Sequence, residues 1–181
     1  MRHENTKGFT LVELLIVIAI TTTIGTVMTL TGAKASASQR ATNIIHGLVN
    51  CKRAVLSLYA DNPDSLPCGD MTEEVAKYLK SEIITLKDGV KHIKGNSADE
   101  GYLTNAVCNV VKPDGRKVDQ LFIEYYSPSV NFDEDVLKGL ARYAKTLKLY
   151  KSPEDLSDAN LISDGDVRTP FYMLVREVPS E

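Results

Sequence analysis

The chain has 181 residues, of which 43% are hydrophobic and 25% charged, a composition that excludes a chain disordered throughout. Its formal net charge is −3 at pH 7, which argues against general nucleic-acid binding because affinity for phosphates requires a surplus of Lys and Arg. Its three cysteines are too few for a disulfide scaffold, and no two of them have the Cys-x-x-Cys spacing of a zinc or redox site.

The amino terminus consists of a polar leader, residues 1–8, followed by a strongly apolar stretch. Residues 14–33 are 20 consecutive positions without a charged side chain. A helix of this length rises roughly 30 Å, which matches the hydrocarbon core of a bilayer. Arg2 and Lys7 favour a cytoplasmic location for the leader, so the residues after Lys34 are expected on the outer side.

Three interpretations fit a basic start followed by an apolar run. One is a cleaved secretory signal, for which residues 35–37, Ala-Ser-Ala, supply a small-residue cleavage site. That signal would be unusually long, and it would contain Glu13, whose carboxylate costs about 2.5 to 3.5 kcal/mol near a bilayer centre. The second is an uncleaved anchor for an external domain, which explains the length but not Glu13. The third treats Glu13 as functional.

A carboxylate within an apolar helix requires a partner that neutralises it. Phe9 lies four residues before Glu13, on the same face of a helix. Cleavage between Gly8 and Phe9 would create a positively charged α-amino group that also needs a partner. The two charges could compensate each other within one chain or between neighbouring chains. Pairing between chains would set the register of an assembly.

A resemblance to a known family lies in residues 7–20, which read Lys-Gly-Phe-Thr-Leu-Val-Glu-Leu-Leu-Ile-Val-Ile-Ala-Ile. This stretch closely resembles the class III signal of type IV pilins and of the pseudopilins of type II secretion. The resemblance implies that a prepilin peptidase cuts after Gly8 and that Phe9 is then N-methylated. It also implies that Glu13 pairs with the amine of a neighbouring subunit during filament assembly.

One feature departs from the pattern of many major pilins. Their helix-bending proline is missing, because no proline occurs between Phe9 and Asn62. Gly25 and Gly32, together with several threonines, could supply flexibility instead, because glycine weakens a helix and threonine hydroxyls bond back to carbonyls. Packing of these small residues between helices is at least as good an interpretation.

The helical pattern continues in amphipathic form through residues 34–60. One apolar stripe recurs at helical spacing and consists of Ile44, Leu48, Cys51, Val55 and Leu58. We therefore expect one helix from Phe9 to about Tyr59. Its first half, residues 9–33, would be the transmembrane and filament-core part, and its second half would brace a domain. Asn62-Pro63 is expected to end the helix.

Residues 61–181 are expected to form one exported α+β domain. After a loop at residues 61–69, Asp70-x-x-Glu73 resembles a capping box that opens a short helix. The inward positions expected for that helix are Val75, Leu79 and Ile83. β-type runs at residues 103–111 and 118–126 flank a Pro-Asp-Gly turn, which predicts a hairpin.

A second helix and a last strand complete the expected domain. Residues 133–135, Asp-Glu-Asp, begin a helix with an acidic start and a basic end. Its apolar positions are Val136, Leu140, Tyr143, Leu147 and Tyr150. Residues 170–178 read as the last strand. The result is a long amino-terminal spine helix packed on a small antiparallel sheet, with a helix inserted before the last strand, which agrees with the pilin resemblance.

The cysteines allow three pairings, since export permits oxidation. The pairing of Cys51 with Cys68 is preferred because a loop after the helix can fold back on it. The pairing of Cys51 with Cys108 is close behind. Three buried thiols without a disulfide are the remaining possibility.

Enzyme signatures are nearly absent. His46 and His92 lie near no Ser or Cys motif, and no glycine-rich phosphate loop occurs. The acidic pair Asp99-Glu100 and the acidic run at residues 133–135 are interpreted as solvated charges. We expect no enzyme, no cofactor and no metal site.

Two weaker signals, a possible calcium site and a basic patch, are explained without a functional role. Asp164-Gly165-Asp166, with Asp155 or Asp158, could bind calcium, but turn aspartates explain the pattern better. A basic patch consists of Lys138, Arg142, Lys145, Lys148 and Lys151. This patch is interpreted as a solvated helix face rather than a site for DNA or a host surface.

The sequence therefore predicts a structural subunit of a type IV pilus-like filament that serves adhesion, motility, DNA uptake or secretion. The subunit would be held in the membrane before assembly and would then enter an extracellular pilus or a periplasmic pseudopilus. Its partners would be other copies of the chain, the prepilin peptidase and the inner-membrane assembly platform. The alternatives are a type II secretion pseudopilin and an uncleaved, membrane-anchored extracellular binding domain.

Overall fold

The structure is a computed structural model that describes residues 11–61, 68–112, 114–128, 134–163 and 170–179. Within residues 11–61, the structure describes the backbone but not the side chains of residues 11, 13 and 23–34. The chain divides into two compact units, Met1–Ser36 and Ala37–Glu181.

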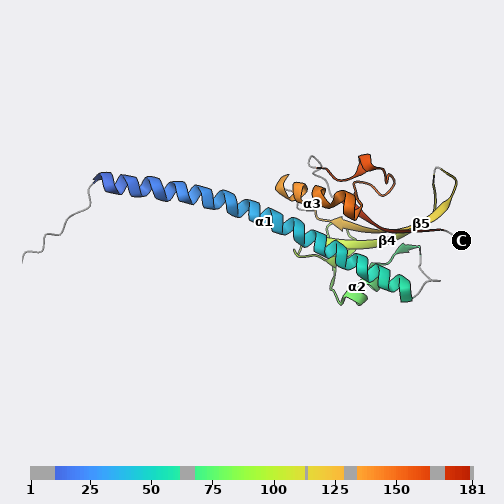
Figure 1. Ribbon diagram of the computed structural model, residues 1–181. Coiled ribbons are helices and arrows are strands. Elements are labelled where there is room, and N and C mark those ends of the chain that lie inside the picture. The colour runs from blue at the N-terminus through green and yellow to red at the C-terminus, as the bar shows by residue number, and fades with distance from the viewer. Residues whose placement is uncertain (1–10, 62–67, 113, 129–133, 164–169, 180–181) are drawn as a thin grey trace, which may run out of the picture. The chain divides into compact units, whose positions relative to one another are not determined.

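Helices and strands occur in the order of an α+β fold, as the sequence predicts (Figure 1). The helices are α1 (Leu11–Asp61), α2 (Thr72–Leu79) and α3 (Glu134–Leu147), with a 3₁₀ turn, η1, at Asp158–Asn160. The strands are β1 (Gly69–Asp70), β2 (Ile83–Thr85), β3 (Lys91–Lys94), β4 (Gly101–Val111), β5 (Lys117–Tyr126), β6 (Leu149–Tyr150) and β7 (Phe171–Pro179).

Within the described residues the strands form one seven-stranded antiparallel sheet in the order β2-β3-β4-β5-β7-β6. β1 also pairs with β4, at residues of β4 that follow those paired with β3. The predicted hairpin is confirmed as β4 and β5, and the predicted last strand is confirmed as β7, which pairs with β5. The inserted helix, α3, precedes β7, as expected.

The predicted spine helix is confirmed as α1, which is continuous from Leu11 to Asp61. Asn62 and Pro63, which were expected to end it, lie outside the described residues. In the second unit, its apolar stripe is buried at Ile44, Leu48, Cys51 and Val55. The stripe therefore faces the core.

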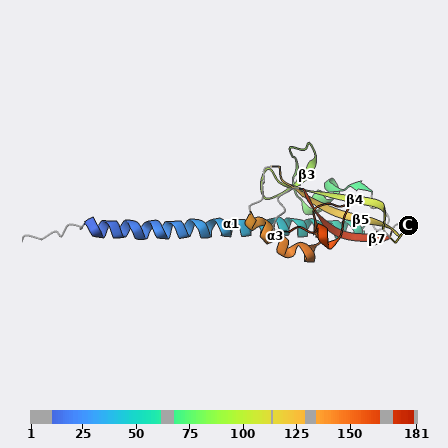
Figure 2. The same ribbon diagram turned by 90° about the horizontal axis from the view of Figure 1, so that it is seen from above.

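The main core lies between one face of the sheet and two helices, the second half of α1 and α3 (Figure 2). Ile123 and Tyr125 of β5 and Met173 of β7 are fully buried in this core. A smaller cluster forms on the alternate side chains of the same strands, because successive side chains point to opposite faces. Its buried members are Phe122, Tyr150 and Leu174.

Two glycines allow elements to approach α1 closely. A Cβ atom at Gly47 of α1 would overlap the Tyr102 hydroxyl, which donates a 3.4 Å hydrogen bond to the Ile44 carbonyl. A Cβ atom at Gly139 of α3 would come within 2.6 Å of the Ala41 Cβ atom. Small residues at these crossings therefore set how near α1 lies to β4 and to α3.

Several local predictions are wrong. The capping box at Asp70 does not form, because Asp70 Oδ1 accepts a 2.9 Å hydrogen bond from the Thr72 amide and Glu73 pairs with Lys91. Ile83 lies in β2 rather than in α2, since Lys80 adopts a left-handed conformation (φ 52°) just after the helix. The helix itself is present.

The inward face of α3 also differs from the prediction. Val136 and Leu140 are buried, but Tyr143 is 50% exposed. Leu137 and Ala144 are buried instead. The predicted helix is also too long. α3 ends at Leu147, Lys148 then adopts a left-handed conformation (φ 56°), and Tyr150 belongs to β6.

Candidate assembly helix

The predicted processing and assembly residues lie at the start of the chain. Gly8 and Phe9 are outside the described residues. Glu13 belongs by its backbone to the first turns of α1, and its side chain is outside the described set. The structure therefore tests neither the cleavage site nor the charge pairing, and both stay predictions.

The described side chains in the first turns of α1 present an apolar surface. Within the first unit, seven large apolar side chains are 50–64% exposed: Val12, Leu14, Leu15, Ile16, Val17, Ile18 and Ile20. Residues 14–18 are consecutive, and successive helical residues are about 100° apart at 3.6 residues per turn. These five side chains therefore surround the helix. A helix that is apolar on all sides is normally buried in protein or lipid.

Threonines just after this apolar surface satisfy their hydroxyl groups within the helix. The Thr21 hydroxyl lies 2.9 Å from the Val17 carbonyl oxygen and 3.0 Å from that of Ile18. The Thr22 hydroxyl lies 2.9 Å from the carbonyl oxygens of both Ile18 and Ala19. These donors need no water, which reduces the penalty of moving this part of α1 into an apolar environment.

A membrane-spanning half is predicted for residues 9–33. In the part of the chain that the structure describes, however, no helix is both long and apolar enough to cross a bilayer.

The second half of α1 is fixed to the sheet by a buried polar network around Glu100. The Glu100 carboxylate accepts a 2.6 Å hydrogen bond from the Tyr125 hydroxyl and a 2.9 Å hydrogen bond from the Ser97 amide. The guanidinium of Arg40, on α1, lies 3.7 Å from the same carboxylate. The pKa of Tyr125 is raised, first by burial and then by its hydrogen bond to Glu100.

The interpretation of Glu100 as a solvated acid is wrong, because only 2% of this residue is exposed. Sequence reasoning missed it because its partners, Arg40 and Tyr125, are far away in the chain. The available signal was a carboxylate shortly before the β-type run at residues 103–111. That signal does not distinguish an exposed loop carboxylate from a buried one.

His92, another residue without an expected role, is fully buried on β3. Its Nε2 atom lies 2.9 Å from Asp88 Oδ2, and its ring stacks on Tyr126 at 5.4 Å between ring centroids. The pair holds the β2–β3 turn, in which Asp88 also accepts a 2.9 Å hydrogen bond from the Val90 amide.

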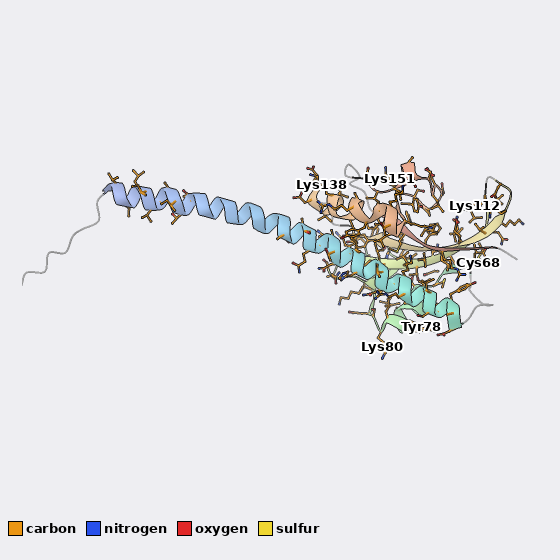
Figure 3. The ribbon with its side chains drawn as sticks, in the orientation of Figure 1. Cys68, Tyr78, Lys80, Lys112, Lys138 and Lys151 are labelled. Carbon is orange, nitrogen blue, oxygen red and sulfur yellow. A yellow bond between two sulfur atoms is a disulfide. The ribbon has the colours of Figure 1, made fainter. Side chains whose placement is uncertain are left out.

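The expected disulfide between Cys51 and Cys68 is replaced by one between Cys68 and Cys108, 40 residues apart in sequence. The short strand β1 explains the exchange, because its pairing of Gly69 with Ala106 brings the preceding Cys68 alongside β4. Figure 3 labels Cys68 beside the strands of the second unit. Cys51 remains a buried thiol in the main core, and burial raises its pKa from 9.0 to about 12.

The weaker metal and basic signals remain unsupported. Asp155 Oδ1 accepts a 2.9 Å hydrogen bond from the Ser157 amide, and Asp158 lies 3.3 Å from Lys145. Residues 164–166 lie outside the described residues, and among the residues that the structure describes no three or more His, Cys, Asp or Glu side chains gather as metal ligands would.

Ion pairs occupy part of the predicted basic patch, which includes Lys138 and Lys151 (Figure 3). Lys138 lies 2.7 Å from Glu134, one turn earlier on α3. This contact agrees with a solvated helix face.

Comparison with known families gives a match at the start of the chain. No curated protein and no solved structure matches it. Residues 5–29 match the family model described as the prokaryotic N-terminal methylation motif, and this stretch contains Gly8, Phe9, Glu13 and the exposed apolar surface of α1. The chain thus carries, at residues 5–29, the class III signal peptide of type IV pilins and pseudopilins, which indicates a type IV pilin-like or pseudopilin protein.

Proposed function

We propose that this protein is a structural subunit of a type IV pilus-like filament. Prepilin peptidase cuts it after Gly8, Phe9 is N-methylated, and the mature chain polymerises through the first half of α1. The observation that carries the proposal is the helix that follows the cleavage site, because its described side chains at residues 14–18 are apolar on every side and half or more exposed. Such a surface requires a partner.

Burial of this surface among other copies supplies the cohesion of the filament. Fully burying a Val, Leu or Ile side chain is worth about 1.5–3 kcal/mol, and the seven side chains between Val12 and Ile20 already hide up to half of their area. Relative to a subunit whose helix is in water, complete burial of all seven contributes on the order of 5–10 kcal/mol before the entropic cost of association. Lipid covers this surface as well as other helices do, so this free energy keeps an assembled subunit out of water and does not draw a subunit from the membrane. The same surface holds the subunit at the membrane before assembly.

Apolar packing alone does not fix register, because neighbouring Leu, Ile and Val side chains are nearly interchangeable. The charge of Glu13 supplies the register. Its carboxylate is stabilised when it meets the amino group of Phe9 on the adjacent subunit, and any other position leaves both charges unpaired in an apolar surrounding.

Features of the second unit suit a domain that lies outside the cytoplasm. Its disulfide, Cys68–Cys108, suits an oxidising compartment outside the cytoplasm. The second half of α1 is locked into this domain by its buried stripe and by the Arg40–Glu100 contact. The proposed role is structural and not catalytic.

The test uses two matched carboxylate-to-amide variants in cells that make the filament. Glu13→Gln keeps the shape of the side chain and removes its charge, so we expect few or no filaments, with subunit still present in the membrane fraction. Glu4→Gln is the control, because Glu4 lies in the leader that cleavage removes, and we expect normal filaments. Sheared filaments are counted by electron microscopy. Normal filaments from Glu13→Gln would contradict the pairing mechanism.

A further inference from the structure

A polar pocket of about 320 Å³ lies in the second unit, between α1 and the segments on either side of β3. This volume is at the small end of the range of roughly 300–1,000 Å³ found for ligand pockets. Asn43, His46 and Asn50, at helical spacing, form one wall from α1. Ser81, Lys94 and Asn96 line it from the other side.

Four of the polar side chains that line this pocket take no part in the hydrogen bonds of the fold. Within the described part of the chain, the side chains of Asn43, His46, Asn50 and Asn96 form no hydrogen bond. His46 and Asn50 are exposed and Asn43 is half-buried, so all of them can reach a ligand. Three carboxamides in one concave surface offer paired donors and acceptors, which match the adjacent hydroxyl groups of a sugar ring.

The floor of the pocket is closed by Tyr102, Cys51 and Ile93, all of which are buried. Gly47 lies directly over the Tyr102 hydroxyl, which fills the space that a side chain at Gly47 would take, so the helix closes directly on the floor. The pocket thus has an apolar base and a polar rim, the arrangement expected for a small ring-shaped polar ligand.

The charge of the lining differs from that of the chain. The chain carries a net charge of −3, but none of the twelve residues that line the pocket is Asp or Glu. Lys94 lies in the lining, and its 2.6 Å ion pair with Glu82 is exposed. An exposed pair of this kind contributes little to stability, so Lys94 can turn to a ligand carboxylate at little cost.

We propose that this pocket binds one acidic monosaccharide. The amides of Asn43, Asn50 and Asn96 hold its ring hydroxyls, and the ammonium group of Lys94 holds its carboxylate in a charge-assisted hydrogen bond. This inference does not depend on filament assembly, because every residue involved belongs to the second unit.

The test compares glucuronate with glucose, which has the same ring and a neutral CH₂OH group in place of the carboxylate. The full chain, labelled with nitrogen-15 in detergent micelles, is titrated with each sugar and followed by amide chemical shifts. We expect saturable shifts at residues 43–51 and 93–96 with glucuronate, and at least about tenfold weaker binding of glucose, equivalent to about 1.4 kcal/mol.

Two lysine variants complete the test. Lys94→Gln is expected to lower affinity for glucuronate to that for glucose, and the matched Lys117→Gln, an exposed lysine outside the pocket, is expected to leave affinity unchanged. The proposal is overturned by any of three results: no saturable shifts, equal affinity for the two sugars, or equal effects of the two lysine variants.

Discussion

The Glu100 carboxylate accepts a 2.6 Å hydrogen bond from the Tyr125 hydroxyl in the interior of the second unit. Arg40 of α1 approaches the same carboxylate, so this pair connects the centre of the sheet to the spine helix. The connection places an acidic side chain within a layer that is otherwise mostly apolar, and a buried polar group of this kind requires hydrogen-bond partners.

Glu100→Ala is expected to lower the free energy of unfolding by about 2–4 kcal/mol, because the Tyr125 hydroxyl and the Ser97 amide lose their acceptor. Tyr125→Phe removes one donor and is expected to cost about 1–2 kcal/mol. The double variant should cost less than the sum, since the two groups share one interaction. Urea denaturation of the full chain in mild detergent measures all three. Simple additivity would show that the hydrogen bond contributes nothing.

Gly139→Ala tests the contact between α3 and α1. At an exposed helix position this change normally stabilises a protein by about 0.5–1 kcal/mol. Here the new methyl group would lie 2.6 Å from the Ala41 Cβ atom, so we expect destabilisation of about 1–3 kcal/mol. Ala41→Gly in the same chain removes the opposing methyl group and should restore part of the loss. The melting temperatures of the single and double variants decide between these outcomes, and a stabilised Gly139→Ala would contradict the packing.

Cys68→Ser tests the disulfide assignment. Opening a cross-link between residues 40 apart is expected to cost about 4 kcal/mol in the chain-entropy model. Cys51→Ala serves as the control, because it removes the remaining cysteine without opening the cross-link, and should cost only about 1–2 kcal/mol.

Alkylation of the unreduced, denatured protein checks the same assignment independently. Only Cys51 is expected to react, and a peptide linking Cys68 to Cys108 should survive digestion. A linked peptide that contains Cys51 would contradict the pairing.

The buried Cys51 thiol predicts a loss of stability in alkali. Its pKa is raised by burial from 9.0 to about 12, so below pH 9 it is neutral in both the folded and the unfolded chain. Between these values only the unfolded chain releases the proton, and the free energy of unfolding falls by about 1.4 kcal/mol per pH unit. The pKa values of Tyr102 and Tyr125 are also raised, chiefly by burial, and add to the loss at higher pH.

Denaturation curves measured at several alkaline pH values check this expectation. Between pH 9 and pH 10, below the ordinary pKa of tyrosine, the free energy of unfolding of Cys51→Ala should fall less steeply with pH than that of the unsubstituted chain. The variant lacks the one titrating thiol. An unchanged slope in this variant would show that the thiol does not titrate as its burial requires.

The sequence predicts the elements that have a strong period and misses those that depend on distant partners. The stripe from Ile44 to Val55 and the β4–β5 hairpin are confirmed, because burial repeats along one segment. The two-residue strands β1 and β6 have no period to detect, and they exist only because a longer strand pairs with them. The disulfide was missed for this reason, since β1 is what brings Cys68 to Cys108.

The candidate site divides in the same way. Residues 5–29 are recognisable because their chemistry is local, with cleavage site, carboxylate and apolar surface within a few turns of helix. The burial of Glu100 and the polar pocket are not recognisable from sequence, because each is assembled from α1 together with segments from later parts of the chain.

The most direct test of the proposed function is the mass of the amino-terminal peptide of subunits recovered from sheared filaments. The proposal requires a chain that begins at Phe9 and carries one added methyl group on its α-amino nitrogen. Recovery of intact Met1, or of a chain that begins at Ser38 after a secretory cleavage, would contradict it.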